Sequence, residues 1–143
     1  MNRKIIKTLL PALFLVSSPF SFANDDVVAI SSVIQKYFDG TSKGQPELVK
    51  EAFLDSLELQ YVSKNGELKR WLGTEYIANI KQNKIKNRKG KIISIDITGN
   101  AAVVKATVKT DKTLFTDYLL LLKLKSGWQV TNKIFTRGKS NIK

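Results

Sequence analysis

Asp117 is the residue of this sequence whose setting best suits chemistry. It lies in an apolar, strand-like run, between Phe115 and Leu119 on one face of the predicted strand. A carboxylate in such a place must be paired, be hydrogen-bonded, or have a raised pKa. It is either a general acid or base on the wall of a pocket, or a structural carboxylate held by Lys133, by Arg70 or by backbone N–H groups. The structural interpretation is favoured, because ionic networks perturb pKa values as active sites do.

The sequence contains no histidine and no cysteine, which narrows the chemistry open to it. Nucleophilic systems of the Ser-His-Asp and Cys-His types are ruled out. A zinc site is not expected without imidazole or thiolate ligands, and the twelve acidic residues are too scattered to suggest a site for a hard cation. We therefore predict no metal and no cofactor, and a non-catalytic protein is favoured over an enzyme.

Aromatic and amide side chains form the candidate lining of a binding pocket, since large rings with a polar tip suit a planar or apolar ligand. The candidates for ligand contact are Tyr61, Trp71, Tyr76, Asp117, Tyr118, Trp128 and Asn132, with Tyr37 as a further lining residue. The alternative is that these rings fill the core, and it is favoured for Tyr37, Trp71 and Trp128. Strand parity predicts that Asn132 shares the face of Trp128 and Val130 at the open end of the pocket.

Three helices are predicted to help position these side chains. Apolar residues recur at helical spacing, and glycine and proline occur where helices end and begin. The predicted helices run from Asn24 to Gly40, from Pro46 to Asp55-Ser56, and from Gly73 to near Asn83.

Six strands account for most of the remaining chain. Their predicted ranges are Leu57–Val62, Leu68–Trp71, Ile92–Thr98, Ala102–Val108, Thr113–Leu124 and Trp128–Phe135. Tight turns join them in pairs at Asn65-Gly66, Gly99-Asn100 and Lys125-Ser126-Gly127. Alternation places Ile93, Ile95 and Ile97 on one face of their strand. The order of elements predicts an α+β fold in which three helices pack inside one strongly bent, mostly antiparallel sheet.

The run Leu119–Leu122 is apolar on both faces of its strand. Such a strand is usually covered on both sides. One side can meet the helices, and a second copy of the sheet is the simplest cover for the other. The sequence therefore predicts a homodimer, and the alternative is a monomer whose C-terminal tail covers the outer leucines.

The N-terminal segment has the features of a signal peptide. Arg3, Lys4 and Lys7 precede a short apolar run, and Ser21-Phe22-Ala23 offers small residues at a cleavage site. We expect cleavage after Ala23, which leaves residues 24–143 as one exported domain. An uncleaved anchor is the less favoured alternative. The expected location is the periplasm of a Gram-negative cell, or otherwise the outside of the cell.

The formal net charge of the chain is +12, and part of it is concentrated in one basic run. Its members are Lys81, Lys84, Lys86, Arg88, Lys89 and Lys91. A solvated helix end and loop is favoured over contact between Lys84–Lys91 and membrane phosphates. Nucleic acid is not an expected partner of an exported chain whose basic run has no interleaved aromatic residues.

Several stretches resemble the nuclear transport factor 2-like superfamily, and more narrowly its exported, lumazine-binding branch. They are Tyr37-Phe38-Asp39-Gly40, Phe53, and the patterns I-x-S-I-D-I-T-G-N-A-A-V, F-T-D-Y-L-x-L-L-K and G-W-x-V-x-N-K-x-F within Ile92–Phe135. The resemblance implies a cone of three helices on a curved, cystatin-like sheet, a cone-shaped pocket, and a frequent homodimer built through the sheet.

Three functions fit this scaffold, which hosts many activities. The leading hypothesis is a non-catalytic small-molecule-binding or accessory module with an apolar cone. The second is an isomerase or dehydratase that uses Asp117 as the base and a tyrosine as the hydrogen-bond donor. The third is an interaction module whose cone is filled.

Overall fold

The computed structural model describes residues 20–140, with side chains described from residue 24. The helices are α1 (Phe20–Lys43), α2 (Pro46–Ala52) and α3 (Gly73–Ala78). The strands are β1 (Phe53–Val62), β2 (Leu68–Leu72), β3 (Lys89–Thr98), β4 (Ala101–Lys109), β5 (Thr113–Leu124) and β6 (Gly127–Lys139). The predicted signal segment, residues 1–23, lies outside the residues whose side chains are described.

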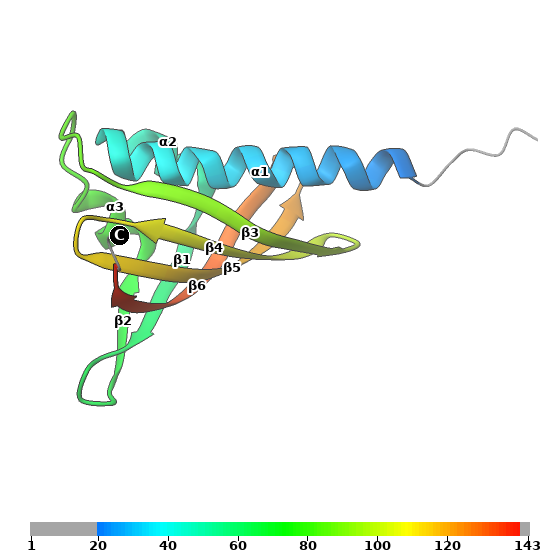
Figure 1. The fold of residues 1–143 in the computed structure, drawn as a ribbon. Helices are drawn as coiled ribbons and strands as arrows, with labels where there is room; N and C mark the ends of the chain where they lie inside the picture. The colour runs from blue at the N-terminus through cyan, green and yellow to red at the C-terminus, as the bar shows by residue number, and fades with distance from the viewer. Residues whose placement is uncertain (1–19, 141–143) are drawn as a thin grey trace, which may run out of the picture.

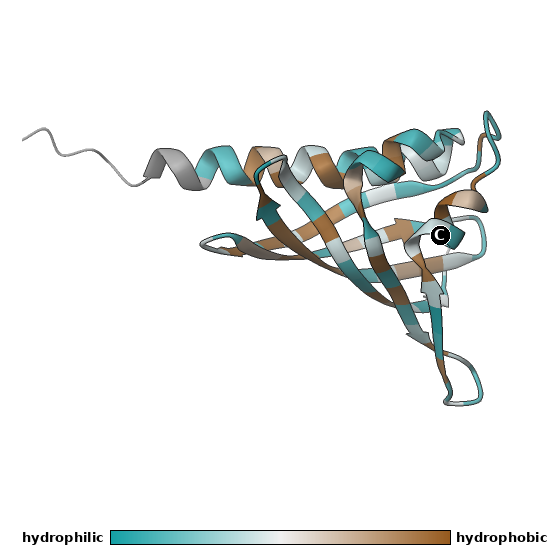
Figure 2. Cartoon of the chain, turned by 180° about the vertical axis from the view of Figure 1, so that it is seen from behind, coloured by the Kyte–Doolittle hydropathy of each residue, from teal (hydrophilic) through white to brown (hydrophobic). Residues whose placement is uncertain are grey.

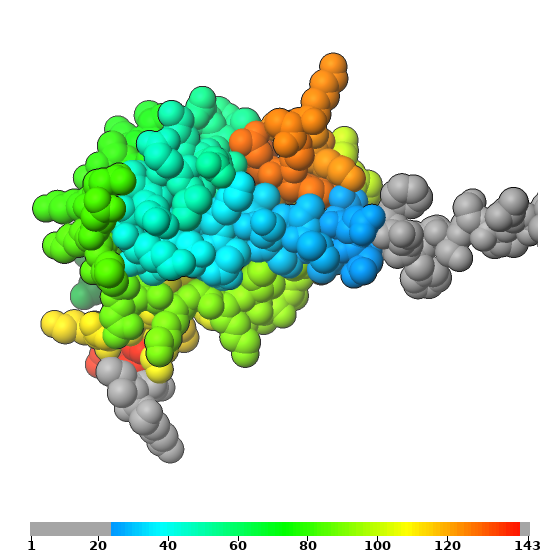
Figure 3. All heavy atoms as spheres, turned by 90° about the horizontal axis from the view of Figure 1, so that it is seen from above, coloured from blue at the N-terminus to red at the C-terminus, as the bar shows by residue number. Residues whose placement is uncertain are grey.

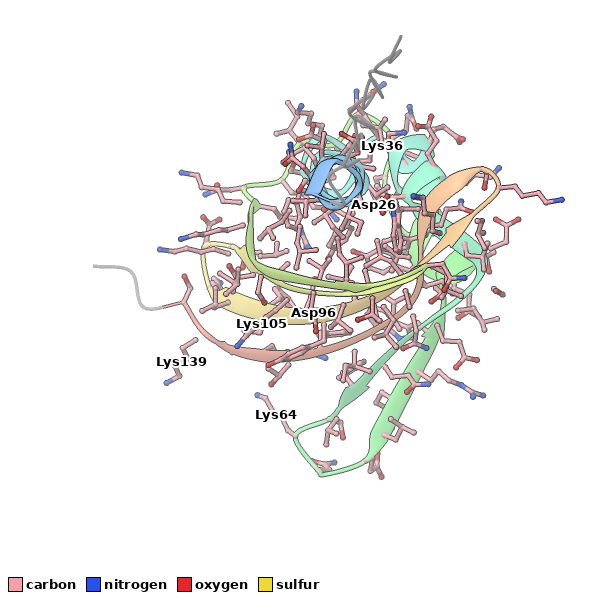
Figure 4. The ribbon with its side chains drawn as sticks, turned by 90° about the vertical axis from the view of Figure 1, so that its right-hand side faces the viewer. Asp26, Lys36, Lys64, Asp96, Lys105 and Lys139 are labelled. Carbon is pink, nitrogen blue, oxygen red and sulfur yellow. The ribbon has the colours of Figure 1, made fainter. Side chains whose placement is uncertain are left out.

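The six strands form one sheet in the order β2-β1-β6-β5-β4-β3. Strands β1 and β6 are parallel, and the other neighbours are antiparallel. Helix α1 lies along one face of this sheet, while the β1–β2 hairpin projects away from it (Figure 1). The view along α1 shows the sheet curving around the helix (Figure 4). The α+β class, the order of elements and the bent, mostly antiparallel sheet are confirmed.

The core lies between α1 and the concave face of the sheet. From above, α1 is flanked by the β5–β6 turn on one side and by β3 and β4 on the other (Figure 3). Ile30, Ile34 and Tyr37 form the buried stripe of α1. The sheet contributes every second residue of β4, including Val104 and Val108. Hydrophobic and hydrophilic stretches are mixed along the strands when the sheet is seen from behind (Figure 2).

The end of α1 differs from the prediction, because the helix passes through Gly40 and ends at Lys43. A Cβ at Gly40 would lie 2.5 Å from the side chain of Val49 and 2.8 Å from the carbonyl oxygen of Gln45. Gly40 therefore permits the close approach of α2. The left-handed residue after the helix is Gly44, whose φ is +66°.

Two other helix ends also differ from the prediction. Strand β1 already begins at Phe53, so Asp55 and Ser56 are strand residues rather than the end of α2. Helix α3 ends at Ala78 instead of near Asn83, and Asn79 donates back to the carbonyl oxygen of Glu75 at 2.9 Å. This short helix passes directly into the loop that leads to β3.

Two irregularities in strand pairing reverse the expected faces. The pairing of β3 shifts between Ile92 and Ser94, so Ile93 is 48% exposed while Ile95 and Ile97 pack against the core. The prediction that all three isoleucines share one face is wrong for Ile93. The extra residue of a β-bulge interrupts the alternation of side chains, which a fixed period of two does not anticipate.

The second irregularity lies in β6, where Thr131 has no partner between Val130 and Asn132. Trp128 and Val130 face the core before this bulge, and Lys133 is the next buried residue after it. Asn132 therefore does not share the face of Trp128 and Val130, and that prediction is wrong. The bulge places a buried lysine inside the cone.

Asp26 links the N-terminal part of α1 to the end of the β5–β6 hairpin through two side-chain hydrogen bonds. Its Oδ1 accepts hydrogen bonds from Lys123 Nζ at 2.7 Å and from Trp128 Nε1 at 2.9 Å. In Figure 4 it lies on the side of α1 that faces this hairpin. The bond from Lys123 first, and then that from Trp128, holds the pKa of the Asp26 carboxyl below its ordinary value.

Acidification is expected to release this contact. The folded-state pKa lies below the unfolded value of about 3.9, so the stabilisation is complete above that value and is lost as the pH falls through the folded-state pKa. The indole N–H resonance of Trp128 should therefore shift as the pH falls below about 4. Asp26→Asn should abolish that shift, and an identical titration in the variant would contradict this role.

Candidate ligand-binding pocket

A pocket of about 180 Å³ lies in the cone between α1, α3 and the sheet. Its lining residues come from six elements and the loop before β3. They are Tyr37, Leu59, Trp71, Tyr76, Arg88, Phe115, Lys133, Phe135 and Arg137. Five of these nine are aromatic and three are basic. This composition combines flat apolar walls with positive charge.

Three buried polar groups from α1, β5 and β6 meet at the wall of this pocket. Lys133 Nζ donates to Asp117 Oδ2 at 3.1 Å and to the hydroxyl oxygen of Tyr37 at 2.9 Å. The Tyr37 hydroxyl donates to the same Oδ2 at 2.8 Å. The side chains of Lys133 and Asp117 are 5% and 0% exposed. The sequence suggested Lys133 or Arg70 as the partner of Asp117, and Lys133 is the partner found.

The electrostatics of this triad keep Tyr37 protonated. Burial first, and then the nearby Tyr76 and Asp117, raise the pKa of Tyr37 well above its ordinary value. The ammonium group of Lys133 also lies over aromatic rings, 4.8 Å from the ring centre of Tyr37 and 5.0 Å from that of Phe135. Lys133 therefore presents a positive group to the pocket, while Asp117 does not line it.

Two arginines complete the polar part of the lining. The guanidinium carbon of Arg88 lies 5.7 Å from the ring centre of Phe115, and that of Arg137 lies 4.4 Å from the ring centre of Tyr61. Neither arginine forms a salt bridge within residues 20–140. The Nε atom of Arg88 is buried and has no hydrogen-bond partner in that part of the chain.

The structure brings only some of the predicted site residues into the pocket. Tyr37, Trp71 and Tyr76 line it, and the ring centres of Trp71 and Tyr76 lie 6.3 Å apart in a stacked arrangement. Trp71 is 43% exposed, so its expected place in the core is wrong. It belongs to β2, which lies at the edge of the sheet and is exposed along its length.

The other predicted residues lie elsewhere. Tyr61 stacks on Phe135 at 4.9 Å, beside the pocket rather than on its wall. Tyr118 points to the outer face of the sheet, where Lys105 lies over its ring. Strand parity explains this position, because Asp117 points inward. Trp128 is buried at the Asp26 end of the cone, and the bulge at Thr131 separates Asn132 from the face of Trp128.

Sequence reasoning did not identify most of the basic and phenylalanine lining. Lys133, Phe135 and Arg137 alternate along β6, and this pattern is a signal that all three share a face. Phe115 could be found in the same way, two residues before Asp117. Arg88 was assigned to a solvated basic run, and its position depends on how the loop before β3 folds back.

Within residues 20–140, no helix is long and apolar enough to cross a membrane. The same part of the chain holds no group of three or more acidic side chains that could bind a metal ion.

The model of the family described as "Putative lumazine-binding" matches residues 25–136, which is most of the chain. The chain belongs to this family. A comparison with curated proteins found no match. The match covers the pocket lining from Tyr37 to Phe135 and ends one residue before Arg137.

Solved structures place this chain within the nuclear transport factor 2-like superfamily. A nuclear transport factor 2-like protein of unknown function from Shewanella baltica has 26% identity and a TM-score of 0.72, over 82% of this chain and 97% of that one. A cystatin-like domain of unknown function from Nostoc punctiforme has 15% identity and a TM-score of 0.65, over 82% and 80%. A ketosteroid isomerase-like protein from Erwinia carotovora has 14% identity and a TM-score of 0.61, over 80% and 97%. The last two likenesses concern the fold alone.

Proposed function

We propose that this family member is an exported, non-catalytic protein that binds a small molecule in the cone. The observation that carries the proposal is the pocket itself, with aromatic walls and the buried ammonium group of Lys133 on its lining. Apolar walls with a few fixed polar groups are the usual composition of a ligand site. The open volume argues against an interaction module with a filled cone.

Proton-transfer catalysis by Asp117 is less well supported than binding. A general base must reach the proton that it abstracts, directly or through one water. Asp117 lies behind the lining residues, and its Oδ2 already accepts hydrogen bonds from Tyr37 and Lys133. This arrangement favours a structural carboxylate that positions Lys133.

We further propose that two copies associate through the outer face of the sheet. Leu119 and Leu121 of β5 are buried in the core, whereas Leu120 and Leu122 are 47% and 42% exposed on the outer face. More apolar side chains extend this face along β4, β5 and β6: Val103, Leu114, Tyr118, Leu124 and Ile134. The alternative cover was the C-terminal tail, but residues 137–139 are paired with β5 within the sheet.

Native mass spectrometry of the protein, isolated without refolding from the exported fraction, tests these proposals together. We expect a chain that begins at Asn24, a mass of two copies, and an additional small-molecule mass in stoichiometric amount. A ligand-free species would contradict the binding function. A monomer would contradict association through the sheet, and an uncleaved chain would contradict export by a cleaved signal peptide.

A further inference from the structure

We infer that the pocket is built for a planar organic anion, an aromatic carboxylate, with its ring between the aromatic walls and its carboxylate on Arg88 and Arg137. This inference rests on the proposed binding function and specifies the class of ligand.

The first support is the imbalance of charge around the pocket. Three cationic side chains line it, and the only acidic partner recorded for any of them within residues 20–140 is Asp117, which is bound to Lys133. By contrast, Arg70 on the exposed β2 lies 3.6 Å from Glu58. The pocket therefore keeps a net positive charge, which a bound carboxylate would reduce.

The second support is a buried donor in the lining that has no acceptor within residues 20–140. The Nε atom of Arg88 is buried and has no hydrogen-bond partner within residues 20–140. A buried donor that lacks an acceptor is costly, and this cost is removed when a ligand supplies the acceptor. A carboxylate suits this position because it accepts two parallel hydrogen bonds from one guanidinium group.

The third support is the position of two guanidinium groups over aromatic rings. Arg88 lies over Phe115, and Arg137 lies over both Tyr61 and Phe135, with the second ring centre at 5.8 Å. A cation–π contact restrains a guanidinium group, and its N–H groups can still donate to a carboxylate.

The fourth support is the shape and size of the apolar part. Trp71 stacks with Tyr76, and the rings of Phe115 and Phe135 lie 6.1 Å apart with their planes tilted by 56°. Flat walls favour a flat ligand through stacking. A volume of about 180 Å³ is below the 300–1,000 Å³ of typical drug-sized sites, which points to a ligand of one or two rings.

Calorimetric titration with three probes of one shape tests this inference: 2-naphthoate, neutral 2-naphthamide and cationic 2-naphthylmethylamine. We expect 2-naphthoate to bind at least about tenfold more tightly than the amide, because a carboxylate accepts charge-assisted, bidentate hydrogen bonds from a guanidinium group and a neutral amide does not. Arg88→Gln and Arg137→Gln should each weaken naphthoate binding about fivefold or more and leave amide binding unchanged. Arg70→Gln is the matched control and should change neither.

Two outcomes would overturn the anionic class. If the neutral or the cationic probe binds as tightly as naphthoate, the pocket does not select an anion, and small-molecule binding itself still stands. If none of the probes binds, the aromatic carboxylate class is wrong, whereas the retained ligand mass from the native protein tests the binding function independently. If Arg70→Gln weakens naphthoate binding as much as the two pocket variants do, the loss of affinity does not come from the arginines of the pocket.

Discussion

Lys133→Ala should lower the free energy of unfolding by about 3–5 kcal/mol, because it leaves a carboxylate buried without its charge partner. Lys133 and Asp117 are almost wholly buried and 3.1 Å apart. Once Lys133 is removed, Tyr37 remains as a neutral donor to Asp117 Oδ2, which does not replace an ammonium group. Urea denaturation followed by circular dichroism measures the change.

The matched control is Lys36→Ala, which removes an ion pair of similar length on the surface. Lys36 lies 2.8 Å from Glu51, with side chains 41% and 56% exposed. The free energy of unfolding of that variant should fall by no more than about 1 kcal/mol. The apolar double variant Lys133→Met with Asp117→Leu should recover much of the loss, because apolar replacement of a buried pair is often neutral. Equal losses in the two single lysine variants would contradict a buried pair that stabilises the cone.

Gly44→Ala should strongly destabilise the packing of α1 against the loop that carries Arg88. Gly44 has a φ of +66°, and an added Cβ would lie 2.5 Å from the backbone nitrogen of Lys84 and 2.6 Å from the carbonyl oxygen of Lys81. Backbone atoms cannot move aside as a flexible side chain can. Left-handed strain and overpacking together should cost about 2–4 kcal/mol.

The same substitution should also affect the pocket. The carbonyl oxygen of Gly44 accepts from the backbone N–H of Asn83 at 2.7 Å, and that of Ser42 accepts from Lys86 at the same distance. These bonds hold the loop before Arg88 against the end of α1. Gly99→Ala is the control, since Gly99 has a φ of +58° but nothing within 4 Å of an added Cβ. The free energy of unfolding of Gly99→Ala should fall by about 1 kcal/mol. An equal fall in both variants would contradict the packing role of Gly44.

The features that follow a regular period could be predicted from sequence. The strand predicted at Ala102–Val108 is β4, and its inward residues alternate as a strand requires. The run Leu119–Leu122, which is apolar on both faces of its strand, belongs to β5, whose outer leucines are exposed. Glycine at a tight turn identified the β5–β6 hairpin, where Gly127 has a φ of +109°.

The features set by distant contacts could not be predicted in this way. Gly40 and Gly44 are both plausible ends of a helix, and only the approach of α2 decides between them. The bulge at Thr131 has no signature in the sequence, yet it decides that Lys133 rather than Asn132 faces inward. The pocket lining depends on that bulge and on the path of the loop to Arg88. The sequence therefore predicted Tyr37, Trp71 and Tyr76 as lining residues but not the basic groups.

Whether the cone holds a ligand is tested most directly by comparing two variants of β2 in native mass spectrometry. Trp71 lines the pocket, whereas Leu68, on the same strand, is exposed and does not. We predict that the retained small-molecule mass is lost from Trp71→Ala and kept by Leu68→Ala. Equal retention by both variants would place the ligand outside the cone, and the absence of any retained mass from the unsubstituted protein would contradict the binding function.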